Sequence, residues 1–159
     1  NGVFKLKNTV LKTEEMKKIP HLILFCMMAI SCTIETSDNG NLDGYWQLSS
    51  IDTLSSNGKT VNMRDSGIFW AVQKDLISTR STHKPFMEIL FKFKLSQDYL
   101  ELNNPYILYR DASDIKVTDV SLLKRFGINS LDENFQILEL KENTMILKSD
   151  ILILYFRKY

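Results

Sequence analysis

The sequence predicts a mostly β protein, a small antiparallel β-barrel with one short helix. Apolar and polar side chains alternate along Phe91–Leu95, which is the period-two pattern of a half-buried strand. Strand-like segments follow one another at hairpin spacing over residues 42–159. Roughly seven or eight short strands in one domain are typical of a closed or nearly closed barrel.

Six segments with strand-like composition follow one another along the chain: one that starts at Gly44, then Ile68–Ile77, Phe91–Leu95, Tyr99–Leu102, Phe135–Leu140 and Thr144–Lys148. The third and fourth predict one hairpin, and the fifth and sixth predict another, because only a few polar residues separate each pair. The last segment, Ile151–Tyr159, is apolar on both sides and rich in β-branched and aromatic residues. It is expected to be a closing strand that packs on two faces.

One short helix, about two turns long, is expected before the last strands. Thr118 or Asp119 can cap its N-terminus, and Gly127 stands where a glycine commonly ends a helix. Its apolar face is formed by Leu122, Leu123 and Phe126.

The segment Met16–Cys32 reads MKKIPHLILFCMMAISC and has the organisation of a signal peptide. Lys17 and Lys18 form a basic start, and Leu22–Ile30 is an unbroken apolar run of nine residues. A helix that spans a bilayer needs roughly 18 apolar residues, so the run fits an export signal better than a membrane span. The alternative is a buried core helix, but nothing downstream looks like a helical partner for it.

Ala29–Cys32 resembles the lipobox of bacterial lipoprotein precursors, although Ala29 stands where Leu or Val is usual. The resemblance implies a signal peptide over residues 16–31 and a lipid on Cys32 that anchors the protein to a membrane. Residues 32–41 are polar and are expected to form a flexible tether. Residues 1–15 precede Met16 and are interpreted as an upstream extension that is not native; a genuine amphipathic extension is the alternative.

The charge balance disfavours nucleic-acid binding, and the cysteine count predicts no internal disulfide. The chain of 159 residues has a formal charge of +1, but fifteen Lys and Arg face seventeen Asp and Glu after Cys32, a balance of −2. This near-neutral mixture does not indicate nucleic-acid binding. Cys26 leaves with the signal peptide and Cys32 would carry lipid, so no internal disulfide is expected.

The motif Gly44-Tyr45-Trp46 is similar to the first signature of lipocalins, in which the Trp plugs the closed end of the barrel. The resemblance implies that Arg157, near the end of the last strand, lies against Trp46 as a cation over an aromatic face. Four longer stretches of the sequence carry a second, more specific resemblance. They are LDGYWQLSSI, GIFWAVQKDL, DIKVTDVSLLKRFGIN and MILKSDILILYFRKY.

These stretches resemble an uncharacterised family of lipocalin-like (calycin-like) lipoproteins of Gram-negative gut anaerobes. The resemblance implies a lipocalin-like barrel over residues 42–159 and a place in the cell envelope, at the outer membrane, facing the periplasm or the surface. It implies no known activity. In true lipocalins the helix follows the barrel strands, whereas here it precedes the last two or three.

Catalysis is poorly supported by the residues, and we expect no enzyme activity, metal or cofactor. His83 is the one histidine after Cys32 and stands in a Ser/Thr/Lys/Pro segment typical of a solvated loop. No Ser-His-Asp set or Cys/His framework can be assembled around it. The run Arg110–Asp114 lacks the glycine and distal Glu of a calcium loop and is interpreted as a polar turn.

Aromatic residues are the candidates for ligand contact, because they offer stacking faces with polar tips. They are Tyr45, Trp70, Tyr99, Tyr106 and Tyr109. Alternatively, Trp70 belongs to the core and the tyrosines lie on the barrel rim.

Two functional hypotheses remain open. The first is a non-catalytic binding lipoprotein that holds a small apolar or amphipathic ligand in the barrel or at its mouth. The second is a structural or interaction lipoprotein of the envelope with a filled barrel, whose partner is another envelope protein. An interior cavity of at least a few hundred Å³ would separate the first from the second.

Overall fold

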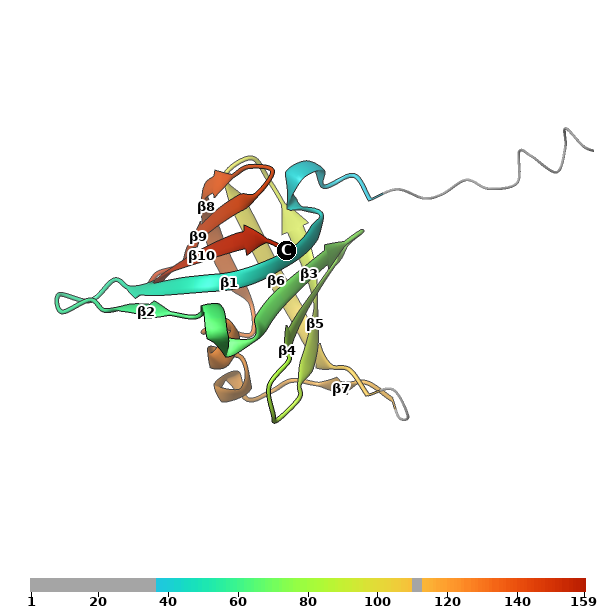
Figure 1. The fold of residues 1–159 in the computed structure, drawn as a ribbon. Coiled ribbons are helices and arrows are strands. Elements are labelled where there is room, and N and C mark those ends of the chain that lie inside the picture. Colours follow the sequence, from blue (N-terminus) through green and yellow to red (C-terminus); the bar gives the residue numbers. More distant parts are fainter. Residues whose placement is uncertain (1–36, 110–112) are drawn as a thin grey trace, which may run out of the picture. The chain divides into compact units, whose positions relative to one another are not determined.

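Eight antiparallel strands close into a barrel in the computed structural model, which describes residues 37–109 and 113–159 (Figure 1). Two further short strands, β2 and β7, extend the sheet beside the ring. The strands are β1 (Gly44–Thr53), β2 (Thr60–Asn62), β3 (Ile68–Gln73), β4 (Leu76–Ser81), β5 (Glu88–Leu95), β6 (Tyr99–Ile107), β7 (Ile115–Lys116), β8 (Glu133–Leu140), β9 (Thr144–Lys148) and β10 (Leu152–Lys158). The 3₁₀ turns are η1 (Gly40–Leu42), η2 (Arg64–Ser66), η3 (Val120–Leu122) and η4 (Lys124–Phe126).

Each strand of the ring pairs with the next ring strand along the chain, in the order β1, β3, β4, β5, β6, β8, β9, β10. Pairing of β1 with β10, from Trp46 opposite Lys158 to Thr53 opposite Leu152, closes the ring. The predicted small antiparallel barrel is therefore confirmed, and closure leaves no unpaired edge in the ring.

Both predicted hairpins are present, as β5–β6 and β8–β9. The prediction of one strand over Ile68–Ile77 is wrong, because the chain turns back after Gln73 and pairs Gln73 with Leu76. Lys74 takes the left-handed conformation that the turn needs, with φ of 56°. Gly or Asn is the usual residue in that conformation, so the sequence carried no signal for this turn.

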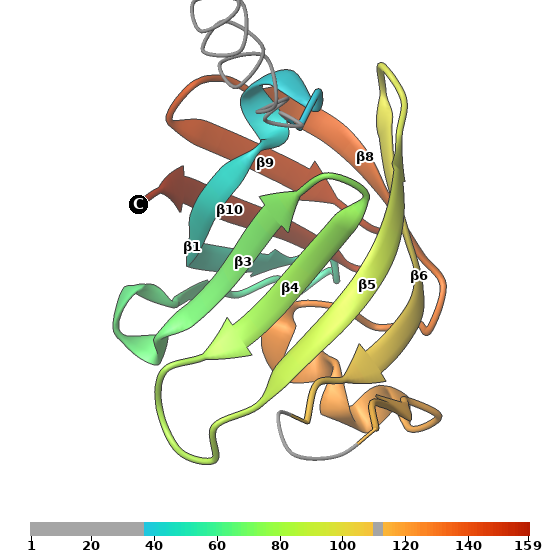
Figure 2. The ribbon, with the colours of Figure 1, turned by 90° about the vertical axis from the view of Figure 1, so that its right-hand side faces the viewer.

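The predicted helix is present as two consecutive 3₁₀ turns, η3 and η4, which precede the last three strands. Asp119 caps the first turn, since its carboxylate accepts a hydrogen bond of 2.8 Å from the backbone N–H of Ser121. Gly127 ends the second turn with φ of 82°. Figure 2 shows these turns at the end of the barrel opposite η1.

The ordered domain begins before Leu42, which corrects the predicted extent of the tether. Ser37 Oγ donates to Asp43 at 2.6 Å, and the side chain of Asn39 donates to the carbonyl of Lys74 in the β3–β4 turn at 2.7 Å. Burial acts to raise the pKa of the Asp43 carboxyl, but hydrogen bonds from Ser37 and Asn39 outweigh it and hold this pKa below its usual value. Local hydrogen bonds thus fix a segment whose polar composition suggested flexibility.

The expected extension 1–15, the signal peptide 16–31, Cys32 and the first part of the tether lie outside the described residues. Within residues 37–109 and 113–159, no helix has the length and apolar character needed to cross a membrane.

Candidate functional site

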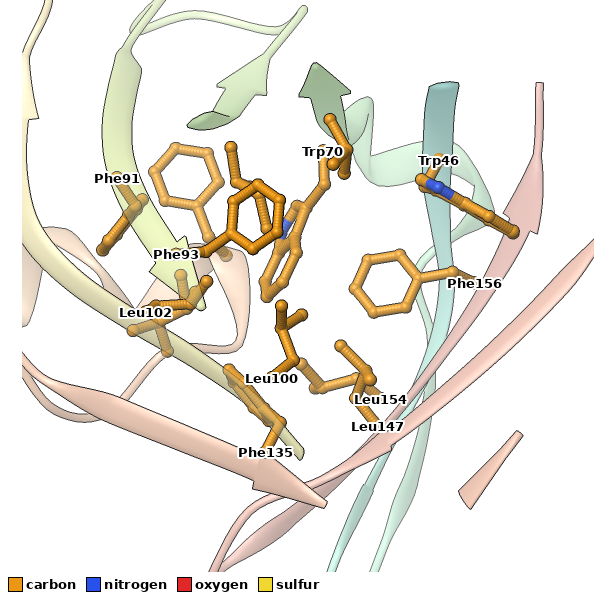
Figure 3. Packing of buried hydrophobic residues seen from close by; sticks show 14 of the residues in the cluster. Trp46, Trp70, Phe91, Phe93, Leu100, Leu102, Phe135, Leu147, Leu154 and Phe156 are labelled. Atoms are coloured by element: carbon orange, nitrogen blue, oxygen red, sulfur yellow. The ribbon is translucent and has the colours of Figure 1, made fainter. Parts of the chain in front are cut away.

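The interior of the barrel is filled by side chains that meet across the ring. Trp70 on β3 and Phe135 on β8 belong to opposite strands, four pairings apart in either direction around the ring. Their ring centroids are 5.8 Å apart, and the Trp70 ring lies 4.9 Å from that of Phe156 on β10. Figure 3 shows these rings meeting inside the barrel, together with Phe91 and Leu100. Because side chains from opposite walls touch, the barrel has no open lumen at this level.

Trp46 is buried at the η1 end of the barrel. The side chain is fully buried, and its indole N–H donates to the carbonyl of Leu42 at 2.8 Å. The ammonium group of Lys158 lies 4.8 Å from the centre of the indole and donates to the carbonyl of Asn41 at 3.1 Å. Gly44, with φ of 124°, leaves room for this lysine, because a Cβ there would stand 2.7 Å from Lys158 Cε.

The prediction that Arg157 lies against Trp46 is therefore wrong, since Lys158 holds that position. Trp46 pairs with Lys158 across β1 and β10, so these two side chains share the inner face. Arg157 pairs with Gln47 and points outward, because successive side chains of a strand alternate between faces. Its Nε donates to Gln47 Oε1 at 2.7 Å, and Gln47 Nε2 donates to the carbonyl of Arg64 at 2.8 Å.

The opposite end of the barrel is closed by η3, η4 and the residues beside them. The buried side chains in this cover are Val117, Leu123, Phe126 and Ile128. Gly127 packs so closely against β10 that a Cβ there would lie 2.7 Å from Leu154 Cδ2. Trp46 on β1 thus covers one end of the barrel, and apolar side chains of the segment between β7 and β8 cover the other.

The five aromatic residues predicted as ligand contacts do not surround one mouth. Trp70 is in the core, whereas Tyr45 stacks on Phe69 at the outer face, with ring centroids 4.8 Å apart. Tyr99 is exposed at the start of β6, Tyr106 is half-buried near its end, and Tyr109 is exposed beyond it. The reading of Trp70 as a core residue is the correct one.

A polar hollow of about 650 Å³ lies on the outside of the barrel, over β6, β8 and β9. Tyr99, Gln136 and Lys148 are direct cross-strand neighbours in the register of these three strands and lie side by side in it. A second hollow of about 280 Å³ adjoins it and shares Asp132, Glu133 and Asn134. We call the two hollows together the outer groove. The outer groove was not predicted from the sequence, because its residues belong to no local motif. Strand register brings them together.

Glu133 lines both hollows of the outer groove, and its surroundings change the pKa of its carboxyl. Burial raises the pKa of its carboxyl above the usual value, and the charge of Asp150 acts in the same direction. Hydrogen bonds from the backbone N–H groups of Asn129 and Ser130 oppose this rise without cancelling it. Glu133 is thus held by the loop before β8, with Asn129 N at 2.6 Å from its carboxylate.

No arrangement for metal binding is seen in the described parts of the chain, where no three or more His, Cys, Asp or Glu side chains converge. His83 is in the exposed loop between β4 and β5, as expected, while part of the run Arg110–Asp114 lies outside the described residues.

A closed eight-stranded antiparallel barrel, with a buried Trp at the start of its first strand, defines the lipocalin-like class of β-barrels. Residues 25–159 match the family profile of the lipocalin-like domain, and the chain belongs to that family. No curated protein matches it.

Two solved structures have similar folds. A lipocalin-like protein from Bacteroides uniformis shares 20% identity with a TM-score of 0.56, over 76% of this chain and 100% of that chain. An uncharacterised protein from Bacteroides eggerthii shares 21% identity with a TM-score of 0.54, over 74% of this chain and 98% of that chain. At these identities the likeness concerns the fold.

Proposed function

We propose that this protein is a non-catalytic, lipid-anchored protein of the cell envelope, whose filled barrel is a scaffold for contacts made at its outer surface. The observation that carries the proposal is the contact of Trp70 with Phe135 across the ring. A ligand pocket usually offers at least 300 Å³ of enclosed space, and these two rings occupy the place where an interior ligand would lie. Of the two hypotheses from the sequence, the geometry favours the interaction protein.

The chemistry of the described residues supports a non-catalytic role. Glu133, the carboxyl group with a raised pKa, accepts hydrogen bonds from backbone N–H groups that hold it in place. A general acid or base needs a free path to a reacting proton. His83, the one histidine among the described residues, lies in the exposed loop between β4 and β5.

Native mass spectrometry of the protein purified from its own host tests the filled barrel. The expected result is the mass of the lipidated chain with no stoichiometric apolar molecule attached. Removal of such a molecule by mild activation, in a one-to-one ratio with the chain, would overturn the proposal in favour of an interior ligand.

The lipid anchor rests on the signal-like segment and on Ala29–Cys32, so replacing Cys32 tests it directly. Metabolic labelling with a clickable fatty acid is expected to mark the wild type and to leave Cys32→Ser unmarked. Equal labelling of both proteins would contradict the anchor. A single acyl chain gives only marginal membrane binding, so a stable anchor requires the additional chains of a lipoprotein.

A further inference from the structure

Several polar side chains in the outer groove have no partner in the protein. Within the described residues, the side chains of Asn134, Gln136 and Lys148 form no hydrogen bond or ion pair. Elsewhere on the outside of the barrel some polar side chains are paired: Ser78 donates to Glu88 at 2.6 Å, and Thr144 donates to Glu139. The groove therefore gathers donors and acceptors that the fold does not use.

The groove also has apolar surface beside its polar floor. Tyr99, 44% exposed, lines it from β6, and Leu54, 41% exposed, lines it from the end of β1. The backbone N–H of Leu54 donates to the carbonyl of Ile151 at 2.9 Å, which ties the end of β1 to the turn before β10. An aromatic ring offers its face to C–H groups, while the amides beside it bind hydroxyl groups.

The shape of the groove suits an extended ligand. The smaller hollow continues the larger one over β6 and adds Glu101 and Asn103 to its lining. Asp132, Glu133 and Asn134 line both hollows, so an extended ligand that occupied the two would lie across these residues. The larger hollow alone lies within the size range of ligand sites, and the two together offer more than one subsite.

We propose that the outer groove binds a neutral saccharide chain, an inference that rests on the proposed function at the outer surface. Vicinal hydroxyl groups match the free amides of Asn134 and Gln136, which both donate and accept. The apolar face of a sugar ring matches the ring of Tyr99. Four carboxylates and one lysine line the groove, which disfavours anionic ligands such as phosphates or acidic glycans.

A cationic peptide is the competing ligand, because carboxylates outnumber Lys148. The groove is lined by more than charge, however: Asn134 and Gln136 stand on β8 and Tyr99 on the adjacent β6. An ammonium group would bind chiefly at the carboxylates, with the Tyr99 ring and the amide oxygens as further contacts. A ligand with hydroxyl and C–H groups uses the amide N–H donors as well, together with the face of the ring.

The test is a microarray of neutral oligosaccharides, built from hexoses, pentoses and N-acetylhexosamines in α and β linkage, probed with the purified full chain. The strongest binder is then measured by calorimetry. We expect binding, and we expect Tyr99→Ala and Gln136→Ala each to weaken it by about tenfold. The matched controls are Tyr109→Ala and Gln73→Ala, which remove the same exposed residue types outside the larger hollow and should stay within about twofold of the wild type.

Three results would overturn the proposal. They are absence of binding to every neutral glycan at about 10 mM, equal binding by the groove variants and their controls, and displacement of the glycan by an oligolysine peptide at lower concentration. Thermal unfolding of each variant shows whether it is folded, and amide chemical shifts of the wild type locate the glycan independently. A negative array with no ligand inside the barrel would overturn the saccharide site while leaving the proposed scaffold role intact.

Discussion

Replacement of Leu123 with Asp is expected to lower the free energy of unfolding by about 4 kcal/mol or more. Leu123 is fully buried where η3 meets η4, in the apolar cover at one end of the barrel. A carboxylate at this position would lose its hydration without gaining a cationic partner. The substitution would also remove the packing contacts of the leucine side chain. The measurement is the denaturation midpoint in urea, followed by tryptophan fluorescence.

Two matched variants separate position from charge. Lys124→Asp places the same carboxylate on the next residue, which is exposed, and is expected to change stability by less than about 0.5 kcal/mol. Leu123→Ala removes only packing and should lower the free energy of unfolding by about 2–5 kcal/mol. This variant still tests the burial of Leu123 if the Asp variant does not fold. An unchanged midpoint for Leu123→Asp would mean that η3 and η4 do not cover the barrel in solution.

The features of the fold that could be predicted from the sequence are those with a local pattern. Alternation along Phe91–Leu95 predicts β5, and a candidate cap at Asp119 with Gly127 predicts the bounds of the helical segment. In each case side-chain periodicity or backbone conformation acts within a few residues. The turn at Lys74 was not predicted, because lysine rarely takes the left-handed conformation that this turn requires and so gives no local signal for it.

Features that depend on strand register could not be predicted. Ile151–Tyr159 is apolar on both faces, so the sequence did not reveal whether Arg157 or Lys158 shares the inner face with Trp46. The pairing of β1 with β10 decides this, and it selects Lys158. Likewise, Tyr99, Gln136 and Lys148 are separate in sequence and meet only because two strand pairings place them in one row.

The filled interior also depends on register, since it needs large side chains from opposite walls at the same level. Many of the core residues could be recognised as apolar in the sequence, but apolar residues line both ligand-binding and filled barrels. What distinguishes the two is the contact of Trp70 with Phe135 and Phe156. A cavity made on purpose in this core is therefore the most direct physical test of its packing.

Replacement of Phe91 with Ala is expected to lower the free energy of unfolding by about 3–5 kcal/mol, because it removes a fully buried ring from the core on β5. The cavity left behind is apolar, and such cavities stay dry and bind benzene. Benzene at ten times its dissociation constant should then restore about 1.4 kcal/mol to the variant, measured as a rise in thermal midpoint. It should not stabilise the wild type, in which the same space is occupied.

Phe86→Ala is the matched control, because Phe86 is 66% exposed and its removal makes no interior space. Its unfolding free energy should stay within about 0.5 kcal/mol of the wild type and should not respond to benzene. If Phe91→Ala does not fold, Phe91→Leu makes a smaller cavity at a lower cost in stability. Stabilisation of the wild type by benzene to the same extent as the variant would mean that the barrel holds open space before any residue is removed, and the filled-barrel interpretation would fail.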